Sequence, residues 1–362
     1  MRICLICTEF FGWGASGGFG YATRVLAREL VKRGIDVCAA VPQPRGTDET
    51  SLTIDGVRIY GFPRLSFLKS ADIYRSCDAD IYHSMEPSLG TYIAMKAMPE
   101  RKHLASLQDP RTTRDWLIEF RHSTLSKLKA ISTFFYYENY FTRWAIRHAD
   151  LVCCPAKFLI PKSRKKFHLD IDPVFMPTPT FIPENVTKAE TPTVCFVGRW
   201  DRRKRPELFF DLAKTFPTVN FVAVGKSQDQ KYENELRHKY KNLSNLEMTG
   251  FINQFEVDCL SKIYGRSWIL ANTAAREGLP NTFFEACGHR CAILSSSDPD
   301  GFASQFGRLV TNEDFAAGLE FLLKDQCWKE QGQRGYEYVK QNYDISAATN
   351  YQIEQYSNLL LK

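Results

Sequence analysis

The most informative part of the sequence runs WILANT (268–273), REGLPNTFFE (276–285) and CAILSS (291–296). The first and third stretches are short and apolar, as expected of buried strands, and the middle stretch is predicted to be helical. Pro280 suits the first helical position, where its missing backbone N–H costs nothing. A strand, a helix and a second strand in this order predict a βαβ unit within a parallel sheet.

The same alternation of predicted strands and helices extends along the chain. Strands are expected at 2–8, 35–41, 57–62, 80–85, 105–108 and 149–156, and again at 193–199, 219–225 and 246–251. Helices are expected at 17–32, about 125–148, 206–215, 280–288, 314–323, 328–342 and 346–361. Such alternation is typical of doubly wound α/β domains with Rossmann-like parallel sheets.

A proline-rich segment at 169–191 interrupts the alternation and predicts a linker between two domains. We therefore expect an N-terminal domain at 1–180 and a C-terminal domain at 181–345. The last helix, 346–362, is expected to pack back on the first domain. Ligands bind at the carboxyl ends of strands in such sheets, so a cleft between the two domains is the predicted site.

The composition is that of an ordinary globular protein, because 44% of residues are hydrophobic and 24% are charged. A net charge of +6 suits an anionic small ligand, and no nucleic-acid-binding motif is present. The 11 cysteines lack zinc-ligand spacing and indicate reduced thiols in a cytoplasmic protein. No apolar run is long enough to cross a bilayer, and the first residues do not resemble a secretory signal.

Two glutamates flank the start of the helix predicted at residue 280. Glu277 lies in the preceding loop, and Glu285 lies about one and a half turns into the helix. The backbone N–H groups of Asn281 and Thr282 lie in the first turn, where the helix dipole favours an anion. Carboxylates accept hydrogen bonds from sugar hydroxyls, so the segment predicts a site for a sugar linked to phosphate. The alternative is that both glutamates are solvated surface charges.

A second segment, VGRWDRRKRP (197–206), follows a predicted strand and leads into a helix. Arg199 and Lys204 are candidates to supply fixed positive charge to a diphosphate leaving group. Arg202, Arg203 and Arg205 are expected to form a solvated basic turn.

The two segments resemble those of the retaining glycosyltransferases of family 4, also called glycosyltransferase group 1. One signature of that family is a glutamate, seven residues and a second glutamate, which Glu277 and Glu285 match. The other is a Gly-Arg turn with a lysine five residues past the arginine, which Arg199 and Lys204 match. The resemblance extends over nearly the whole chain and is most specific from about 193 to 296. It implies the GT-B fold and hexosyl transfer from a nucleotide-diphosphate sugar to a hydroxyl acceptor, with retention of anomeric configuration.

The resemblance also implies roles for individual residues. Glu277 would bind the donor sugar through its distal hydroxyls, and Glu285 would bind the ribose. Arg199 and Lys204 would neutralise the diphosphate. The loop and helix start would face the sugar and phosphate; these residues are Gly278, Leu279, Pro280, Asn281 and Thr282. Many members have a glycine and aliphatic residues where this sequence has Pro280, Asn281 and Thr282. This departure bears on the preference for the donor.

In the N-terminal half, glycines crowd the turn after the first strand. The resemblance implies that Gly17 and Gly18 lie beneath the donor diphosphate and shape the acceptor pocket. Their spacing is not that of a dinucleotide-binding fingerprint, which argues against a nicotinamide oxidoreductase. Family members often have a histidine after a later strand that contacts the donor sugar. His83 occupies that position in one register and Met85 in another, and a purely structural role for His83 stays open. Asp109 is a weaker candidate for acceptor contact.

Residues 123–140 mix Lys127 and Lys129 with apolar side chains. They are compatible with a helix on a membrane surface, as in relatives that glycosylate lipids. The preferred interpretation is a core-facing helix with a basic outer side. The expected partners are the nucleotide-sugar donor and a glycan or lipid-linked acceptor, with peripheral membrane contact left open.

Three Asp-x-Asp triplets, beginning at Asp78, Asp170 and Asp298, imitate the metal motif of the other large glycosyltransferase fold. Such short matches arise easily by chance. Since two cationic side chains and a helix end are available for the phosphates, no metal and no cofactor beyond the co-substrate are expected. Three rivals remain: a sugar-nucleotide epimerase of the same fold, a non-catalytic carbohydrate-binding subunit, and a nicotinamide oxidoreductase, which the glycine spacing weakens.

Overall fold

The computed structural model describes residues 1–14, 17–44, 46, 48–63, 67–123, 127–255 and 259–361. It divides into two compact units. The first consists of Met1–Pro110, Ser132–Pro179 and Ile345–Lys362, and the second of Arg111–Ile131 and Thr180–Asp344. The junction between residues 179 and 180 lies in the proline-rich segment. Residues 111–131 group with the second unit, although they fall within the interval expected for the N-terminal domain.

Within the described residues, the first unit contains an eight-stranded sheet in the order β3-β4-β2-β1-β5-β6-β7-β8. Its strands are β1 (Arg2–Ile6), β2 (Asp36–Pro42), β3 (Ser51–Ile54), β4 (Val57–Phe62), β5 (Ile81–Ser84), β6 (Lys102–Ser106), β7 (Leu151–Cys154) and β8 (Val174–Phe175). Only the edge strand β3 is antiparallel to its neighbour; the other pairs are parallel.

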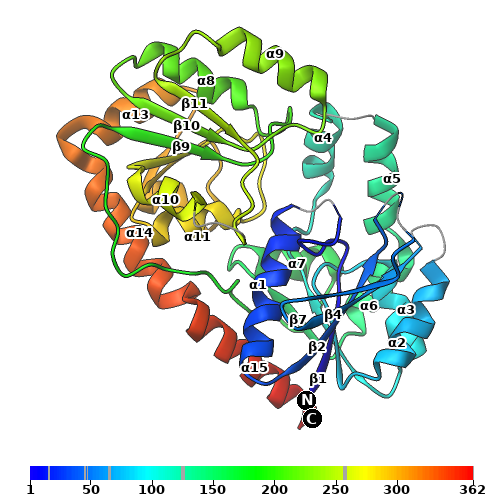
Figure 1. Cartoon of the computed structure of the whole chain (residues 1–362). Coiled ribbons are helices and arrows are strands. Elements are labelled where there is room, and N and C mark those ends of the chain that lie inside the picture. The colour runs from blue at the N-terminus through cyan, green and yellow to red at the C-terminus, as the bar shows by residue number, and fades with distance from the viewer. Residues whose placement is uncertain are drawn as a thin grey trace. The chain divides into compact units, whose positions relative to one another are not determined.

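Helices cover both faces of this sheet (Figure 1). They are α1 (Gly18–Lys32), α2 (Ser70–Cys77), α3 (Leu89–Ala97), α6 (Tyr140–Arg147), α7 (Leu159–Phe167) and α15 (Ile345–Leu360), with a short 3₁₀ turn at Phe67–Lys69. Because successive strand residues point to opposite faces, Leu5 packs in the core beneath α1 and α15 while Cys4 packs beneath α2 and α3. This two-sided burial explains why β1 is apolar throughout.

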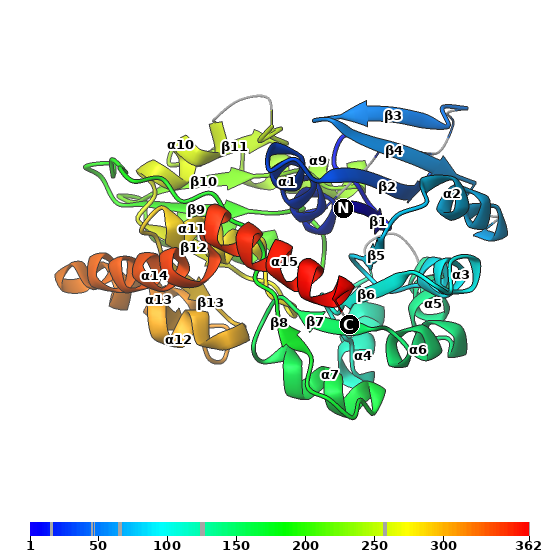
Figure 2. The same cartoon turned by 90° about the horizontal axis from the view of Figure 1, so that it is seen from below.

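The last helix, α15, lies beside α1 (Figure 2). Its Tyr356 and Leu359 belong to the apolar core of the first unit. Arg33, which caps α1, donates hydrogen bonds to Ser346 and Asn350 near the start of α15. The chain therefore returns from the second unit to complete the core of the first.

The second unit contains a parallel sheet of six described strands in the order β11-β10-β9-β12-β13-β14. They are β9 (Thr193–Val197), β10 (Asn220–Val224), β11 (Leu246–Gly250), β12 (Ile269–Asn272), β13 (Ala292–Ser295) and β14 (Gly307–Leu309). The helices around it are α8 (Pro206–Thr215), α9 (Gln230–Tyr240), α10 (Cys259–Arg266), α11 (Asn281–Gly288), α12 (Phe302–Phe306), α13 (Phe315–Leu323) and α14 (Cys327–Tyr343), with 3₁₀ turns at Pro299–Gly301 and Lys324–Gln326.

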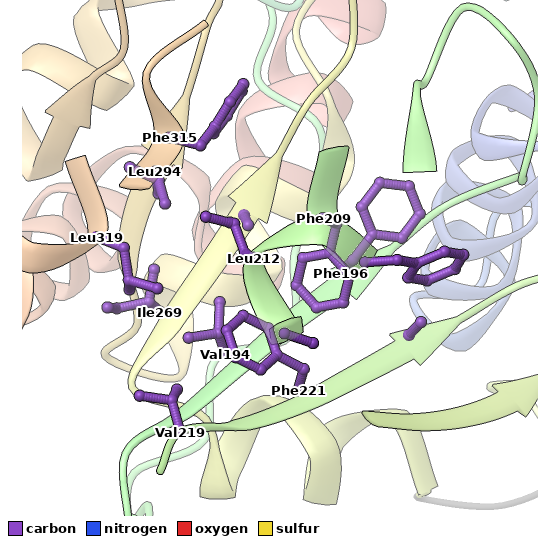
Figure 3. Packing of buried hydrophobic residues seen from close by; sticks show 14 of the residues in the cluster. Val194, Phe196, Phe209, Leu212, Val219, Phe221, Ile269, Leu294, Phe315 and Leu319 are labelled. Atoms are coloured by element: carbon purple, nitrogen blue, oxygen red, sulfur yellow. The ribbon is translucent and has the colours of Figure 1, made fainter. Parts of the chain in front are cut away.

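Aromatic and aliphatic side chains fill one side of this sheet (Figure 3). Phe209 of α8 lies edge-on to Phe221 of β10, with ring centroids 5.4 Å apart. Val194 of β9 and Leu319 of α13 are also fully buried there. Burying one large apolar side chain contributes about 1.5–3 kcal/mol, so this face supplies much of the stability that holds the strand ends in place.

Two predicted helices have different bounds in the structure. Pro280 is the N-cap of α11 rather than its first helical residue, because its ψ of 131° is extended. The helix predicted over about 125–148 consists of α5 (Lys127–Tyr137) and α6. Asn139 separates them: its side chain accepts a hydrogen bond from the backbone N–H of Thr142 at 2.8 Å and starts α6 anew. None of the helices in the described part of the chain has both the length and the apolar character of a bilayer-spanning segment.

Candidate functional site

Glu277 lies in the loop between β12 and α11 and is held by groups from two segments. Its side chain is 7% exposed. The ammonium of Lys204 donates to its Oε1, and the Asn272 amide donates to the same oxygen at 3.2 Å. Nη1 of Arg203 lies 3.8 Å from the other oxygen, Oε2. The structure thus brings Glu277 and Lys204 together and adds Asn272 and Arg203, which the sequence analysis did not assign to the site.

These neighbours decide the charge of Glu277. Burial alone would raise its pKa, but the positive charges of Lys204 and Arg203 and the two hydrogen bonds outweigh that effect and lower it. The carboxylate is therefore ionised and fixed in orientation. A fixed carboxylate at the start of a helix is suited to accepting hydrogen bonds from ligand hydroxyls.

The turn that carries Lys204 is held against its neighbouring strands by backbone contacts. Gly198 N–H donates to the carbonyl of Val224 at 3.1 Å, and Trp200 N–H donates to that of Lys226 at 3.0 Å. Gly225 lies between these contacts with a φ of 133°, and a Cβ there would lie 1.9 Å from the carbonyl oxygen of Gly198. A glycine is required at residue 225 for the basic turn to approach β10.

The other arginines of this turn do not form the solvated cluster that the sequence predicted. The side chain of Arg203 is 17% exposed and that of Arg205 is 14% exposed. Arg205 pairs with Glu313 and donates to the carbonyl of Thr273 at 2.7 Å, while Arg202 lies over the ring of Tyr232. The expectation was wrong for Arg203 and Arg205, which neighbouring loops and helices cover, whereas Arg202 is exposed as predicted.

Arg199 differs from Lys204 in its environment. Its side chain is 49% exposed, and its Nε lies 3.7 Å from Asp201. The backbone N–H of Lys204 donates to the same aspartate at 2.9 Å, which ties the two ends of the turn together. Arg199 is therefore a half-exposed cation in the same turn as Lys204, the covered partner of Glu277.

Two carboxylates of a neighbouring helix contact the arginines of this loop. α4 (Thr113–Arg121) belongs to the second unit. Its Asp115 and Glu119 lie 3.0 and 3.1 Å from the guanidinium of Arg276, whose side chain is only 4% exposed. Arg203 lies 3.6 Å from Glu119 and donates at 3.0 Å to the carbonyl of Arg276. Sequence reasoning missed these contacts because 157 residues separate Glu119 from Arg276.

The start of α11 carries the positive end of a helix dipole. Pro280 offers no side-chain cap, and the first turn contains no acidic residue, so no carboxylate of the helix itself neutralises this end. Gly278 and Leu279 complete the connection from Glu277 to Pro280, Asn281 and Thr282. The predicted loop-and-helix-start arrangement is thus present, displaced by one residue at the N-cap.

Glu285 lies on α11 and is partly buried. Tyr264 of α10 donates to its Oε2 at 2.8 Å. Burial raises the pKa of Glu285 to about 7, which the hydrogen bond from Tyr264 opposes. Glu277 and Glu285 thus share one loop and helix but have opposite pKa shifts, because cations surround only the first.

In the first unit, Gly17 lies at the start of α1, as its N-cap. Its backbone N–H donates to Oε2 of Glu9 at 2.5 Å, so a carboxylate lies at this helix end beside Gly17 and Gly18. Glu9 also lines a small cavity with Phe19 and Glu86. The carboxylate of Glu86 accepts hydrogen bonds from Thr8 at 3.0 Å and Tyr137 at 2.8 Å. These carboxylates follow β1 and β5, at the carboxyl edge of the sheet.

His83 is buried in the first unit, which fits the structural role that the sequence left open. It is 1% exposed, its Nδ1 lies 2.7 Å from the Tyr356 hydroxyl, and its Nε2 lies 2.6 Å from the Ser106 hydroxyl. Burial lowers the pKa of His83 to about 3, so the ring is neutral. Both ring nitrogens are thus engaged by hydroxyls of the first unit, and His83 also lines a small cavity with Ser106 and Met176. Met85, the alternative position, lines the same cavity as Glu9.

Two further expectations concern other parts of the chain. In α5 the side chains of Leu128 and Phe135 are 79% and 65% exposed, so the preferred core-facing orientation was wrong for them; residues 124–126 lie outside the described part. Of the Asp-x-Asp triplets, Asp78 and Asp172 pair with arginines, and Asp298 accepts the backbone N–H groups of Ala303 and Ser304. These aspartates have structural partners.

The chain is similar to known proteins in sequence and in structure. Residues 178–341, somewhat less than half of the chain, match the family model "Glycosyl transferases group 1". Sucrose-phosphate synthase from Thermosynechococcus elongatus is similar in structure, with a TM-score of 0.76, 15% identity and 99% of each chain covered. This chain has the GT-B fold. The predicted fold is thereby confirmed, and the match places Glu277, Lys204 and α11 within the family region.

Two other GT-B structures extend the comparison. Anabaena Alr3699/HepE in complex with UDP-glucose has a TM-score of 0.71 and 14% identity, with 99% of this chain and 100% of that chain covered. The pneumococcal O-GlcNAc transferase GtfA in complex with UDP and GlcNAc has a TM-score of 0.68 and 11% identity, with 100% and 99% covered. No curated protein matches the sequence. The family match and the GT-B fold together support glycosyl transfer as the activity.

Proposed function

We propose that this chain transfers a hexosyl group from a nucleotide-diphosphate sugar to a hydroxyl acceptor, with retention of anomeric configuration. The observation that carries the proposal is the ionised Glu277, which Lys204, Asn272 and Arg203 hold beside the start of α11. It lies in the region that matches the group 1 glycosyltransferases. That HepE binds UDP-glucose and GtfA binds UDP and GlcNAc is consistent with a nucleotide-sugar donor.

The donor binds to the second unit in this proposal. Glu277 accepts hydrogen bonds from the sugar hydroxyls, and Glu285 lies on the ribose side of α11. The diphosphate meets the positive end of α11 and the cation of Arg199, which is exposed enough to reach it. Lys204 has three donor hydrogens, so its ammonium can contact Glu277 and a phosphate oxygen together.

Positive charge next to the leaving diphosphate lowers the barrier to bond cleavage, because it stabilises the charge that develops there. Arg199, Lys204 and the helix end supply it without a metal ion. The acceptor hydroxyl then attacks from the face that the diphosphate leaves, and the departing phosphate takes the proton. Retention follows from attack on that face.

The acceptor binds to the first unit in this proposal. The carboxylates of Glu9 and Glu86 line the cavity at the carboxyl edge of its sheet and are suited to hold acceptor hydroxyls. Gly17 and Gly18 bring the α1 backbone close to Glu9 and shape this cavity. A glycan or a lipid-linked sugar offers the hydroxyls that such a cavity requires.

A diphosphate-release assay with UDP-, GDP- and ADP-hexoses and a panel of glycan acceptors tests the proposal. We expect acceptor-dependent release with one donor. We also expect Glu277→Gln and Lys204→Ala each to lower kcat/KM by about 100-fold or more. The matched controls are Glu320→Gln and Lys214→Ala, which change exposed side chains of α13 and α8. Near-normal rates in both site variants would overturn the site assignment.

Two outcomes would favour the rival functions. Isomerisation of the donor without any acceptor would identify an epimerase, since that reaction needs no second substrate. Binding of a nucleotide sugar that never leads to diphosphate release would identify a carbohydrate-binding subunit.

A further inference from the structure

Three cysteines far apart in the sequence meet in the core of the first unit. The Sγ atoms of Cys4, Cys38 and Cys77 all lie within 4.8 Å of one another, and all three residues are buried. Cys4 and Cys38 are directly paired in the parallel register of β1 and β2, and Cys77 is the last residue of α2. The three thiols are free. Among the described residues, no other group of three potential ligands approaches as closely.

We propose that Cys4, Cys38 and Cys77 form a binding site for one thiophilic metal ion, Zn²⁺ or Cu⁺. This cluster is called the thiol triad below. A metal–sulfur bond of about 2.3 Å implies sulfur atoms about 3.8–4.0 Å apart, so thiols that lie within 4.8 Å of one another need only small side-chain shifts to share one ion. Thiolates are also the ligands that select Zn²⁺ and Cu⁺ over hard ions such as Mg²⁺.

Two arginines lie near the triad. Arg2 begins β1, two residues before Cys4, and its Nε lies 2.6 Å from Asp36. Arg58 lies directly across from Cys38 in the pairing of β4 with β2. When three thiols coordinate one ion, the protons they still carry are released to solvent. Arg58 then offsets part of the negative charge that three thiolates leave on a Zn²⁺ or Cu⁺ centre, whereas Arg2 is already paired with Asp36.

The triad is distinct from the proposed transfer site. Cys4 lies in the middle of β1, whereas Glu9 follows the carboxyl end of that strand. A bound ion would link β1, β2 and α2, which are otherwise joined by backbone pairing and apolar contacts. The expected role is structural, so the inference stands independently of the proposed function.

Metal titration of the reduced, full-length protein tests the inference. Cys259 and Cys327 are the two less buried thiols, so the titration uses a Cys259→Ser/Cys327→Ser background to remove competing ligands. Cd²⁺ reports thiolate coordination through its sulfur-to-metal charge-transfer absorption, and Zn²⁺ and Cu⁺ then compete for the site. We expect one ion per chain, with Tm raised by about 5 °C or more at saturating metal.

Cys38→Ala and Cys77→Ala each remove a proposed metal ligand. We expect each to weaken metal affinity by more than ~10–100-fold, which is the effect of losing a residue that only contacts a ligand. Cys7→Ala is the matched control for metal affinity, because Cys7 follows the same strand but packs on the opposite face of the sheet. Unchanged affinity in a folded Cys38→Ala or Cys77→Ala variant would overturn the inference. So would equal loss in the Cys7→Ala control.

Alkylation mapping provides a test that does not depend on the variants folding. Saturating Zn²⁺ or Cu⁺ should protect Cys4, Cys38 and Cys77 of the unmodified chain together, by about tenfold or more in rate relative to Cys7. Two results contradict the inference: absence of selective protection, and formation of a disulfide within the triad in place of metal binding.

Discussion

Lys204 and Glu277 form a largely buried ion pair across 73 residues of sequence, between the turn after β9 and the loop after β12. Breaking such a pair from one side leaves the other charge poorly compensated. The side chain of Lys204 is still 18% exposed, and Arg203 and Asn272 remain beside the carboxylate, which limits the cost of losing it.

Lys204→Ala should therefore lower the free energy of unfolding by about 1–3 kcal/mol, less than for a fully buried pair. Urea denaturation monitored by tryptophan fluorescence measures this, with Lys214→Ala as the control. Because Glu277→Gln also removes the charge of the partner, the double variant should be less destabilised than the two single variants suggest. Additive single-variant effects would show that the pair has no coupling energy.

The buried carboxyl of Glu285 should make stability depend on pH. Its pKa is raised from 4.5 to about 7 in the folded state. Between those two values the folded protein retains a proton that the unfolded chain has released, so stability falls as pH rises. Above pH 7 the folded protein must ionise Glu285, and the full cost of that ionisation lowers the free energy of unfolding by about 3 kcal/mol.

Glu285→Gln removes this titration. We subtract the free energy of unfolding of the unsubstituted protein from that of Glu285→Gln at each pH. This difference should rise by up to about 3 kcal/mol between pH 4 and pH 8. Urea unfolding at several pH values checks this. Glu320→Gln, on the exposed side of α13, should show no such trend, and a flat difference for Glu285→Gln would disprove the raised pKa.

The acidic residues of α4 should act on the donor loop through Arg276 and Arg203. Glu119→Gln removes the carboxylate shared by both arginines, so we expect kcat/KM to fall by about tenfold without loss of the fold. Arg114→Gln is the matched control, since Arg114 is exposed on the same helix. Equal activity of Glu119→Gln and Arg114→Gln would show that α4 has only a structural role.

His83 should stabilise the first unit rather than contact the donor. His83→Phe leaves the buried hydroxyls of Tyr356 and Ser106 without this partner, and we expect a loss of about 2–3 kcal/mol. The donor KM should stay within about threefold of its original value, as steady-state kinetics on the folded variant would measure. A change in donor KM as large as that of Glu277→Gln would show that His83 contacts the donor directly.

Divalent hard ions should not assist the transfer, because Arg199, Lys204 and the start of α11 supply the positive charge. After treatment with EDTA, addition of Mg²⁺ or Mn²⁺ should change kcat by less than about twofold. A strong recovery of rate on adding either ion would show that a metal takes part in diphosphate departure.

The sequence by itself determined the alternation of strands and helices. Apolar residues repeat every two positions in a strand and every 3.6 positions in a helix, and both periods depend only on residues close together in the sequence. It also predicted a site at Glu277, Glu285, Arg199 and Lys204, because short loops between a strand and a helix keep their residues at the sheet edge. The break before α6 was missed, as one capping residue, Asn139, outweighs a continuous helical pattern.

Only the tertiary structure decided which of these groups meet. It pairs Lys204 with Glu277, turns His83 toward Tyr356, adds α4 to the second unit and gathers Cys4, Cys38 and Cys77. Those contacts depend on the order of strands in each sheet and on the path of long connections. Local periodicity predicts neither the strand order nor the path of the connections, because a contact between distant residues depends on how the whole unit packs.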